Sequence, residues 1–402
     1  MMTVGFVIDR SKPAAFMTFD FDQVPDRRNS DSIKWQTYGN KDVVPMWIAD
    51  MDFPSPPPII EAIRQRVEHG IFGYAQPLAS TIESVVAMLE ERHQWKIDPS
   101  WIVWLPGLVI GLNVAARACA EPGEEILHFT PSLPPIIDAP TNGDRISRTV
   151  PLVLDSKNNS WEIDWAALEA AVTPSTRGLF LCHPHNPIGR VWRRDELNLI
   201  GEFCLRHNLY LCSDEVHCDL ILDPALTHCP AGMLDSRLAN RTITLISPSK
   251  TYNLAGLGTS LAIIPNDALR GRFVRAMSGV AAVTDPIGYV ACEAAYRDCE
   301  PWRKELVGYL RSNRDYLVKL VHTELPIIKI EAPIEATYLA WLNVRELHLG
   351  NPAAHFIKHG VALNDGTPFG APKGEYVRLN FACSRATLTE GLTRLKSAIS
   401  SL

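Results

Sequence analysis

A succession of short apolar runs between residues 101 and 265 is the feature that most constrains the fold of this chain. The runs "WIVWL", "EILHFT", "GLFLCH", "NLYLCS", "RTITLI" and "SLAIIP" are strand-like, and helical stretches such as 194–207 separate several of them. Short apolar strands that alternate with helices are typical of a mostly parallel sheet that helices cover on both faces. We therefore predict a doubly wound α/β sheet.

The pattern changes near residue 285. A long helix is predicted over 301–325, then strands in "ATYLAWLNV" and "YVRLNFA", and a final helix over 388–401 that Thr387 opens with Glu390 in capping-box spacing. The 402 residues are enough for two domains. We expect a segment that packs on the small domain (1–55), a large domain that contains the sheet (56–290) and a small α+β domain (291–402).

Charge and composition exclude several classes of partner. The net charge of −6 argues against nucleic acid or an anionic membrane surface, because both bind clustered Lys and Arg. No apolar run approaches the ~18 residues that span a bilayer, and "MMTVGFVIDRSK" lacks the apolar core of a signal peptide. Nine scattered cysteines without a C-x-x-C pair indicate reduced thiols, so we expect a cytoplasmic protein.

Histidines and cysteines near the strand ends raise the alternative of a metal site. The cysteines alternate with apolar residues in strand-like runs, and the spacing fits no metal-binding pattern. We therefore favour structural roles and predict no metal ligands among these residues: His183, His185, His217, Cys182, Cys212 and Cys218.

Chemically reactive residues follow several of the predicted strands, at the sheet edge where open α/β folds bind ligands. Asp214 directly follows "NLYLCS", Lys250 follows "RTITLI" after three residues, and "WIVWL" runs through Gly107 into a helix whose free amides could hold a phosphate. A lysine amine, a carboxylate and an anion site together suggest pyridoxal 5′-phosphate. That cofactor needs an amine to hold it covalently, a carboxylate to keep its ring nitrogen protonated, and donors for its phosphate.

Longer motifs carry a family resemblance over residues 20–395. They are "DRRNSDSIKWQTYG", "MWIADMDFPSPPPIIEAI", "GIFGYA", "HPHNPIGRVW", "SDEVHCDLIL", "SPSKTYNLAGL", "ATYLAWL", "GVALNDGTPFG" and "YVRLNFACSR". With these motifs the chain resembles the fold-type I, class I/II aminotransferase-like enzymes, and within them the MalY/PatB branch of cysteine–sulfur β-lyases. The resemblance implies a large domain with a doubly wound sheet, a smaller α+β domain, and a homodimer with shared active sites.

The resemblance also implies roles for residues around the cofactor ring. Lys250 would hold the cofactor and take the substrate's α-proton, and Asp214 would pair with the ring nitrogen. Asn186 would donate a hydrogen bond to the ring hydroxyl, and Arg378 would bind the substrate carboxylate with its fork of donors. His217 would lie near the ring hydroxyl, with a structural histidine as the alternative.

Further roles concern the phosphate and the substrate. Ser247, Ser249 and the amides of Leu108 and Val109 would bind the phosphate. Tyr74 would reach the phosphate and substrate of the neighbouring subunit, with a core or rim tyrosine as the alternative. Asp50 would lie on the substrate side.

Two positions depart from the family pattern. Leu133 stands in "TPSLPP" where this branch normally has a tyrosine that stacks on the cofactor ring. Gly258 stands where many relatives have an arginine or lysine that grips the phosphate. We expect the cofactor to be retained, because neither change removes Lys250, Asp214, Asn186 or Arg378. The changed ring wall at Leu133 leads to the hypothesis that the enzyme acts on a different thioether.

The reaction implied is β-elimination from an L-cysteine S-conjugate, giving thiol, pyruvate and ammonia. Transamination, or an oxidative or decarboxylating variant, uses the same residues and stays an alternative. An alternative of another class is a regulatory protein that binds a transcription activator, as some relatives of this branch do. Intact Lys250 and Asp214 favour an enzyme acting on a small amino acid.

Overall fold

A computed structural model describes residues 19–39, 41–155 and 157–402 of the chain. The motif "MMTVGFVIDRSK", and with it the prediction that no signal peptide is present, lies outside the described residues, as does the start of the predicted 1–55 segment. Among the described helices, none combines the length and the apolar character that crossing a membrane requires.

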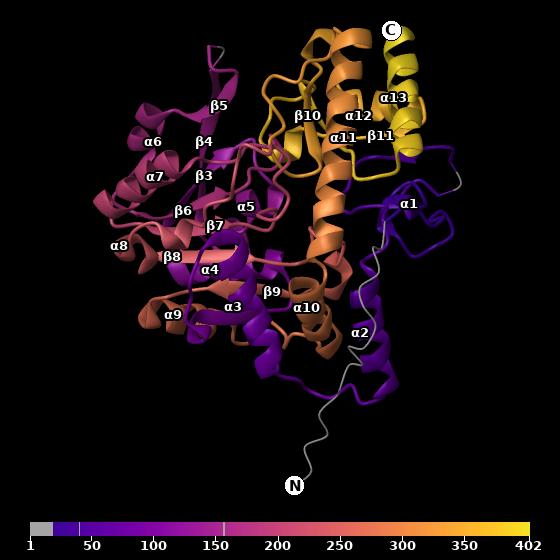
Figure 1. Cartoon of the computed structure of the whole chain (residues 1–402). Helices are drawn as coiled ribbons and strands as arrows, with labels where there is room; N and C mark the ends of the chain where they lie inside the picture. The colour runs from indigo at the N-terminus through magenta and orange to yellow at the C-terminus, as the bar shows by residue number, and fades with distance from the viewer. Residues whose placement is uncertain (1–18, 40, 156) are drawn as a thin grey trace.

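An eight-stranded sheet forms the centre of the large part of the chain (Figure 1). In spatial order its strands are β2 (Ile102–Leu105), β9 (Ser260–Ile263), β8 (Thr242–Ile246), β7 (Tyr210–Asp214), β6 (Thr176–Cys182), β3 (Glu125–Thr130), β4 (Ile146–Asp155) and β5 (Ser160–Ile163). The five strands from β8 to β4 are parallel, whereas β9 is antiparallel to both of its neighbours and β5 is antiparallel to β4. The predicted doubly wound α/β sheet is confirmed. The sequence analysis missed β4 and β5.

Apolar side chains on both sides of the strands explain why helices cover both faces of the sheet. In β6, Phe180 packs into the cluster that contains α4 and α9, while its neighbours Leu179 and Leu181 pack into the cluster that contains α7 and α8. Since successive side chains of a strand point to opposite faces, such runs bury both faces. The helices around the sheet are α2 (Pro57–Glu68), α3 (Ala79–His93), α4 (Leu108–Cys119), α5 (Pro134–Asp138), α6 (Trp165–Ala171), α7 (Arg194–Arg206), α8 (Ser236–Ala239), α9 (Asp267–Met277) and α10 (Pro286–Asp298).

The C-terminal part contains an antiparallel sheet in the order β10 (Leu339–Asn343), β13 (Tyr376–Asn380) and β12 (Asn364–Asp365). The long helix α11 (Glu300–Glu324) lies beside α13 (Arg385–Ser400) in Figure 1, and α12 (Pro352–Lys358) completes this part. The prediction for the last helix was wrong at its start. Ser384, rather than Thr387, is the cap, because its hydroxyl accepts from the Thr387 amide at 3.2 Å.

The N-terminal segment contacts the C-terminal part. It contains α1 (Ile33–Gln36) and β1 (Val44–Pro45), and β1 pairs in parallel with β11 (Val361–Ala362). Arg394 of α13 binds both the carboxylate and the carbonyl of Asp42. The domain limits at residues 55 and 290 stay predictions.

Candidate active site

The carboxyl ends of β2, β8, β7 and β6 bring the predicted residues to one edge of the sheet. β9 runs between β2 and β8 in the opposite direction, and its first residue, Ser260, pairs with Leu105 at the end of β2. The next residue, Leu261, pairs with Ile246 at the end of β8. The segments 106–108 and 247–250 therefore leave the same edge of the sheet.

Lys250 lies in the turn that follows β8, and its Nζ donates a hydrogen bond to the Ala49 carbonyl at 2.7 Å. The pKa of Lys250 is lowered to about 8, chiefly by burial and next by the charge of the nearby Arg378 guanidinium, while Asp50 and Asp214 act in the other direction. A lysine with such a pKa has a substantial neutral fraction near pH 7 to 8, which a nucleophile and a proton acceptor both need.

Asp214 is the last residue of β7 and is 1% exposed. Its Oδ1 accepts from the Val216 amide at 3.2 Å, whereas its Oδ2 is buried without a hydrogen-bond partner among the described residues. Burial raises the pKa of Asp214 to about 7, although the Val216 bond and the Lys250 charge act in the other direction. A buried carboxylate oxygen without a partner calls for an explanation, and a cationic ligand would satisfy it.

Arg378 of β13 and Asn186, which follows β6, are brought together although 192 residues separate them. Arg378 Nη1 donates to Asn186 Oδ1 at 3.1 Å, and Nη2 donates to Asn364 Oδ1 at 2.7 Å and to the Trp47 carbonyl at 3.1 Å. The guanidinium lies 4.6 Å from the centre of the Phe369 ring. Nε is buried without a partner among the described residues, so the guanidinium is held through its two Nη atoms while its Nε donor is unused.

His217 lies at the same edge, edge-on to the Tyr338 ring at 5.7 Å between ring centres. Burial lowers the pKa of His217 to about 3, with smaller contributions from the charges of Lys250 and Arg378. The imidazole is therefore neutral at physiological pH, and its Nδ1 has no hydrogen-bond partner among the described residues.

The predicted phosphate residues lie around the start of α4. This helix has Gly107 as its cap and no side-chain cap, so the first-turn amides, including those of Leu108 and Val109, are left for another acceptor. Ser247 Oγ donates to the Thr259 carbonyl at 2.7 Å and accepts from the Ser249 amide at 3.1 Å. Both serines therefore belong to a tightly folded turn beside this helix start.

The backbone conformation explains why residue 258 is a glycine and not the cation found in many relatives. Its φ is +58°, and a Cβ at this position would lie 2.6 Å from the Pro106 carbonyl oxygen. The backbone passes too close to the start of α4 for a side chain to fit without a shift. The glycine thus keeps the turn after Lys250 packed against the helix that is expected to hold the phosphate.

Leu133 caps α5, and the preceding Ser132 amide donates to the Phe369 carbonyl at 2.9 Å. The segment with Leu133 therefore contacts the loop that contains Phe369, whose ring packs against the Arg378 guanidinium. The Asp50 carboxylate is close enough to Lys250 to raise its pKa, and it is paired with Arg27 at 2.9 Å.

Tyr74 is the predicted residue that this chain alone does not bring to the site. It is fully exposed in the segment between α2 and α3, and its exposed apolar neighbours are Ile71, Phe72 and Leu78.

Several residues at the site escaped the sequence analysis. The carbonyl of Ala49 accepts from both Lys250 and the Tyr338 hydroxyl, the latter at 3.0 Å. Asn364 and Phe369 support Arg378. All four lie inside quoted motifs, but a backbone carbonyl and a ring beneath a guanidinium leave no signal of their own in a single sequence.

The residues fit the predicted cofactor. Asp214 Oδ2 is a partnerless carboxylate oxygen for a protonated ring nitrogen, Lys250 is a partly neutral amine, and the uncapped start of α4 offers amides for a phosphate. These three features lie at one sheet edge.

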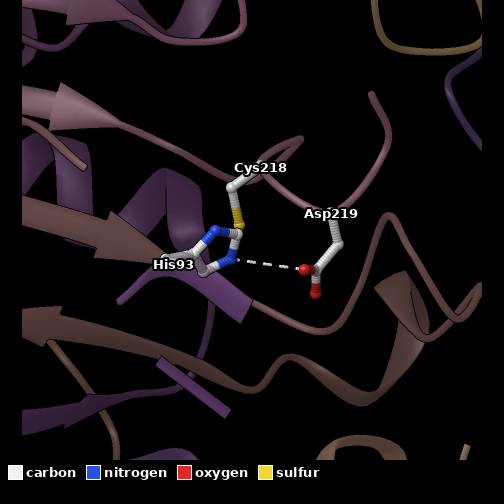
Figure 2. A group of neighbouring side chains, drawn as sticks. All are labelled: His93, Cys218 and Asp219. Carbon is white, nitrogen blue, oxygen red and sulfur yellow. Dashed lines mark ion pairs between the residues drawn. The ribbon is translucent and has the colours of Figure 1, made fainter. Parts of the chain in front are cut away.

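A second group of buried polar residues lies nearby but has a different character. Figure 2 shows His93 and Cys218 beside Asp219, with His93 Nε2 at 3.3 Å from Asp219 Oδ1. Asp219 Oδ2 is bound by Arg92 at 2.8 Å, and burial raises the pKa of the Cys218 thiol well above its usual value. Because an arginine neutralises the carboxylate and the thiol keeps its proton, we assign this group to an ion pair and not to a metal site.

Comparison with known proteins agrees with this geometry. The model of the family described as aminotransferase class I and II matches residues 41–395. Cystathionine β-lyase PatB of Bacillus subtilis (strain 168) is 38% identical over 392 residues, covering 95% of this chain and 100% of that protein. The crystal structure of OvoB matches with a TM-score of 0.91 and 42% identity, covering 96% of this chain and 100% of OvoB.

Cystalysin from Treponema denticola, whose structure contains pyridoxal 5′-phosphate, matches with a TM-score of 0.90 and 33% identity, covering 96% of this chain and 100% of cystalysin. The family model and these full-length matches agree with each other. The chain therefore belongs to the aminotransferase class I and II family and is a homologue of PatB-type cystathionine β-lyases.

Proposed function

We propose that this chain is a pyridoxal-phosphate-dependent carbon–sulfur β-lyase. It converts an L-cysteine S-conjugate or a cystathionine-like thioether, together with one water, to a thiol, pyruvate and ammonia. The observation that carries the proposal is the partnerless Oδ2 of Asp214 at the same sheet edge as the Lys250 amine. Relatives named as lyases, such as PatB and cystathionine β-lyase from Corynebacterium glutamicum, support the choice of reaction.

Each residue has a defined task in this proposal. When bound, pyridoxal phosphate withdraws electrons from the substrate's α-carbon. Asp214 would keep the positive charge on the ring nitrogen, and Asn186 would donate to the ring hydroxyl. Lys250 Nζ would hold the cofactor, and its amine would accept the substrate's α-proton and give a proton to the departing sulfur. Arg378 fixes the substrate carboxylate.

The remaining residues orient the phosphate and surround the ring. Ser247, Ser249 and the amides of Leu108 and Val109 would hold the phosphate. Neutral His217 would approach the ring hydroxyl side without adding charge.

Product analysis tests the reaction. The purified protein is incubated with S-substituted cysteines and with L-cystathionine, and thiol, pyruvate and keto-acid products are measured together. We expect pyruvate and thiol in equal amounts without any added keto acid. Strict dependence on a keto acid would instead establish transamination, which the same residues could support.

Leu133 is proposed to shift the substrate preference, because leucine packs on the ring without the stacking and hydroxyl of tyrosine. We expect Leu133→Tyr to raise turnover of L-cystathionine relative to other thioethers by a few-fold, roughly the 1 kcal/mol of an aromatic contact. Unchanged relative rates across the substrate panel would remove support for this role.

We also propose a cytoplasmic homodimer. The exposed apolar segment with Tyr74 supports a partner subunit, and nine free cysteines suit a reducing compartment. If Tyr74 serves the neighbouring site, mixing and refolding the inactive variants Tyr74→Phe and Lys250→Ala restores activity, since a hybrid dimer has one intact site. A mixture that stays inactive while hybrids form would contradict shared sites.

A further inference from the structure

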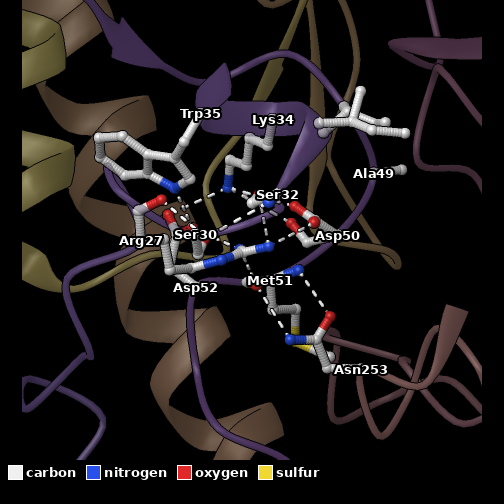
Figure 3. A network of polar contacts seen from close by, with 12 residues as sticks. Arg27, Ser30, Ser32, Lys34, Trp35, Ala49, Asp50, Met51, Asp52 and Asn253 are labelled. Carbon is white, nitrogen blue, oxygen red and sulfur yellow. Dashed lines mark hydrogen bonds and ion pairs between the residues drawn. The ribbon is translucent and has the colours of Figure 1, made fainter. Parts of the chain in front are cut away.

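Two of the quoted motifs, "DRRNSDSIKWQTYG" and "MWIADMDF", meet in one charged network around Asp50 and Asp52 (Figure 3). Arg27 Nη2 binds Asp50 Oδ2 at 2.9 Å, and Arg27 Nη1 binds Asp52 Oδ1 at 2.9 Å. Lys34 Nζ lies 3.0 Å from Asp52 Oδ2 and 3.6 Å from Asp50 Oδ1. We call this network, with Ser32 and Trp35 as further partners, the N-terminal clamp.

The charges of the clamp balance, and its side chains are held in one arrangement by paired contacts. Two cations face two carboxylates, and the side chains of Lys34 and Asp52 are only 1% and 4% exposed. Buried ion pairs contribute little net stability because desolvation offsets their attraction, and their best-supported use is to fix a geometry. The question is therefore which geometry this network fixes.

The clamp fixes the backbone of residues 49–53. Arg27 Nη1 also donates to the Met51 carbonyl at 2.9 Å, and Lys34 Nζ lies 3.5 Å from the Asp50 carbonyl. From the other side, Asn253 accepts from the Met51 amide at 3.0 Å and donates to the carbonyls of Met51 and Phe53, each at 2.9 Å. This short stretch is thus held between the clamp and the turn that carries Lys250.

The stretch begins at Ala49, whose carbonyl accepts from Lys250 Nζ at 2.7 Å. We propose that the N-terminal clamp positions the amine of Lys250 by holding residues 49–53 so that the Ala49 carbonyl meets Nζ. Arg27, Lys34 and Asn253 are positioning residues in this sense, since none of the three is placed in contact with cofactor or substrate. The inference rests on the proposed function, in which Lys250 holds the cofactor.

Through Asp50, the clamp also contributes to the electrostatic environment of Lys250. The charged groups that act on Lys250 are Arg378 from β13, Asp214 from β7 and Asp50 from the clamp itself, and neutral His217 and the Tyr338 hydroxyl lie beside them. Arg27 neutralises Asp50. Removal of Arg27 leaves a stronger negative field at Lys250, which favours the protonated amine and raises its pKa.

Cofactor capture by the cofactor-free protein tests the proposal independently of the lyase reaction. Pyridoxal phosphate is added over a range of pH, the rate of capture is followed by absorbance, and borohydride then fixes the cofactor to the lysine that holds it. Peptide mass spectrometry identifies that lysine. A label on another lysine would refute the proposed role of Lys250 itself, so the two proposals fail in different ways.

Three variants separate geometry from charge. Arg27→Met is expected to slow capture about 10-fold, as misplacing a reacting group does, and to raise the pH midpoint by roughly half a unit. Arg27→Lys keeps the positive charge but loses the paired donors of the guanidinium. We therefore expect slower cofactor capture with an unchanged pH midpoint. Asn253→Gly tolerates the left-handed φ of +58° and changes no charge, so it too slows capture at an unchanged midpoint.

Arg394→Met is the matched control, because it removes an arginine that ties the same N-terminal segment to α13 through Asp42, away from Lys250. It is expected to leave rate and midpoint unchanged. If Arg27→Met does not fold, Arg27→Lys still decides the question, because it removes the fork of the clamp and keeps the charge. Wild-type rates and midpoints in Asn253→Gly and in any folded Arg27 variant, or equal slowing in Arg394→Met, would overturn the proposal.

Discussion

Asp214 and Asp219 follow each other within five residues, and both are almost fully buried, at 1% and 4% exposure. Asp214 keeps one oxygen without a partner, and burial raises its pKa to about 7. Burial also opposes ionisation of Asp219, but Arg92 and His93 hold its pKa below the usual range. Two similarly buried aspartates thus differ in their partners. Asp214 has a carboxylate oxygen that a ligand could bind, whereas the charge of Asp219 is neutralised by side chains of the same chain.

The contrast teaches that burial alone does not mark a functional carboxylate. A structural aspartate has a counter-ion within its own chain, whereas a ligand-binding aspartate has a buried oxygen without a hydrogen-bond or charge partner in the protein. We therefore expect a substitution of Asp214 to reduce activity, and a substitution of Asp219 to reduce the free energy of unfolding.

Asp214→Asn is expected to give the largest effect. The amide cannot hold a positive charge on the cofactor's ring nitrogen, so kcat/KM for β-elimination should fall by roughly 10³-fold, as when a preorganised charge partner is removed. Steady-state kinetics with a cysteine thioether measure this. Activity within a few-fold of the unaltered protein would remove the distinction between the two aspartates.

Asp219→Asn should act on stability instead. The substitution leaves Arg92, whose side chain is 10% exposed, with Glu300 at 3.1 Å as its remaining ion-pair partner among the described residues. We expect a loss of about 3 kcal/mol in the free energy of unfolding, measured in denaturant, with the absorbance of the bound cofactor unchanged. A stable variant with altered cofactor absorbance would contradict the assignment.

The pH dependence of the cofactor-free protein sharpens the same comparison. Native Asp214, with a pKa of about 7, keeps a proton that the unfolded chain releases near pH 4, so its contribution to stability falls as pH rises from 4 to 7. Lys250, with a pKa of about 8, gives the opposite slope between pH 8 and about 10.5. Asp214→Asn should therefore match the unaltered protein near pH 4 and exceed it in melting temperature at pH 7 to 8.

Tyr252→Phe should give the smallest effect. Tyr252 lies two residues after Lys250, but its hydroxyl accepts from Arg92 at 2.9 Å and so belongs with Asp219. We expect a loss of about 1 kcal/mol in stability and an unchanged rate of cofactor capture. A slower capture would show that the two groups are coupled through this tyrosine.

Much of the fold could be predicted because its signals are local. Apolar runs such as that of β8 (Thr242–Ile246) identify strands without knowledge of their neighbours. β4 was missed because its exposed positions, among them Ile146 and Val153, carry no clear alternation of apolar and polar residues. The start of α13 was misplaced because Ser384 and Thr387 both have a capping hydroxyl, and the choice between them depends on the backbone.

The candidate site was predictable where a side chain has a chemical role of its own, as for Lys250, Asp214 and Arg378. The partners that orient these residues were not predictable from one sequence. Ala49 acts through its carbonyl, and Asn253 acts through bonds to a backbone some 200 positions away. Such contacts depend on tertiary packing.

The close approach of Gly258 to the Pro106 carbonyl has an evolutionary consequence. A phosphate-gripping cation introduced at 258 alone should be poorly accommodated, because a Cβ there would lie 2.6 Å from the Pro106 carbonyl oxygen and the backbone would have to shift. The turn at 106–107 would have to move first or at the same time. An arginine introduced at 258 should therefore succeed only together with changes that move the backbone at the start of α4.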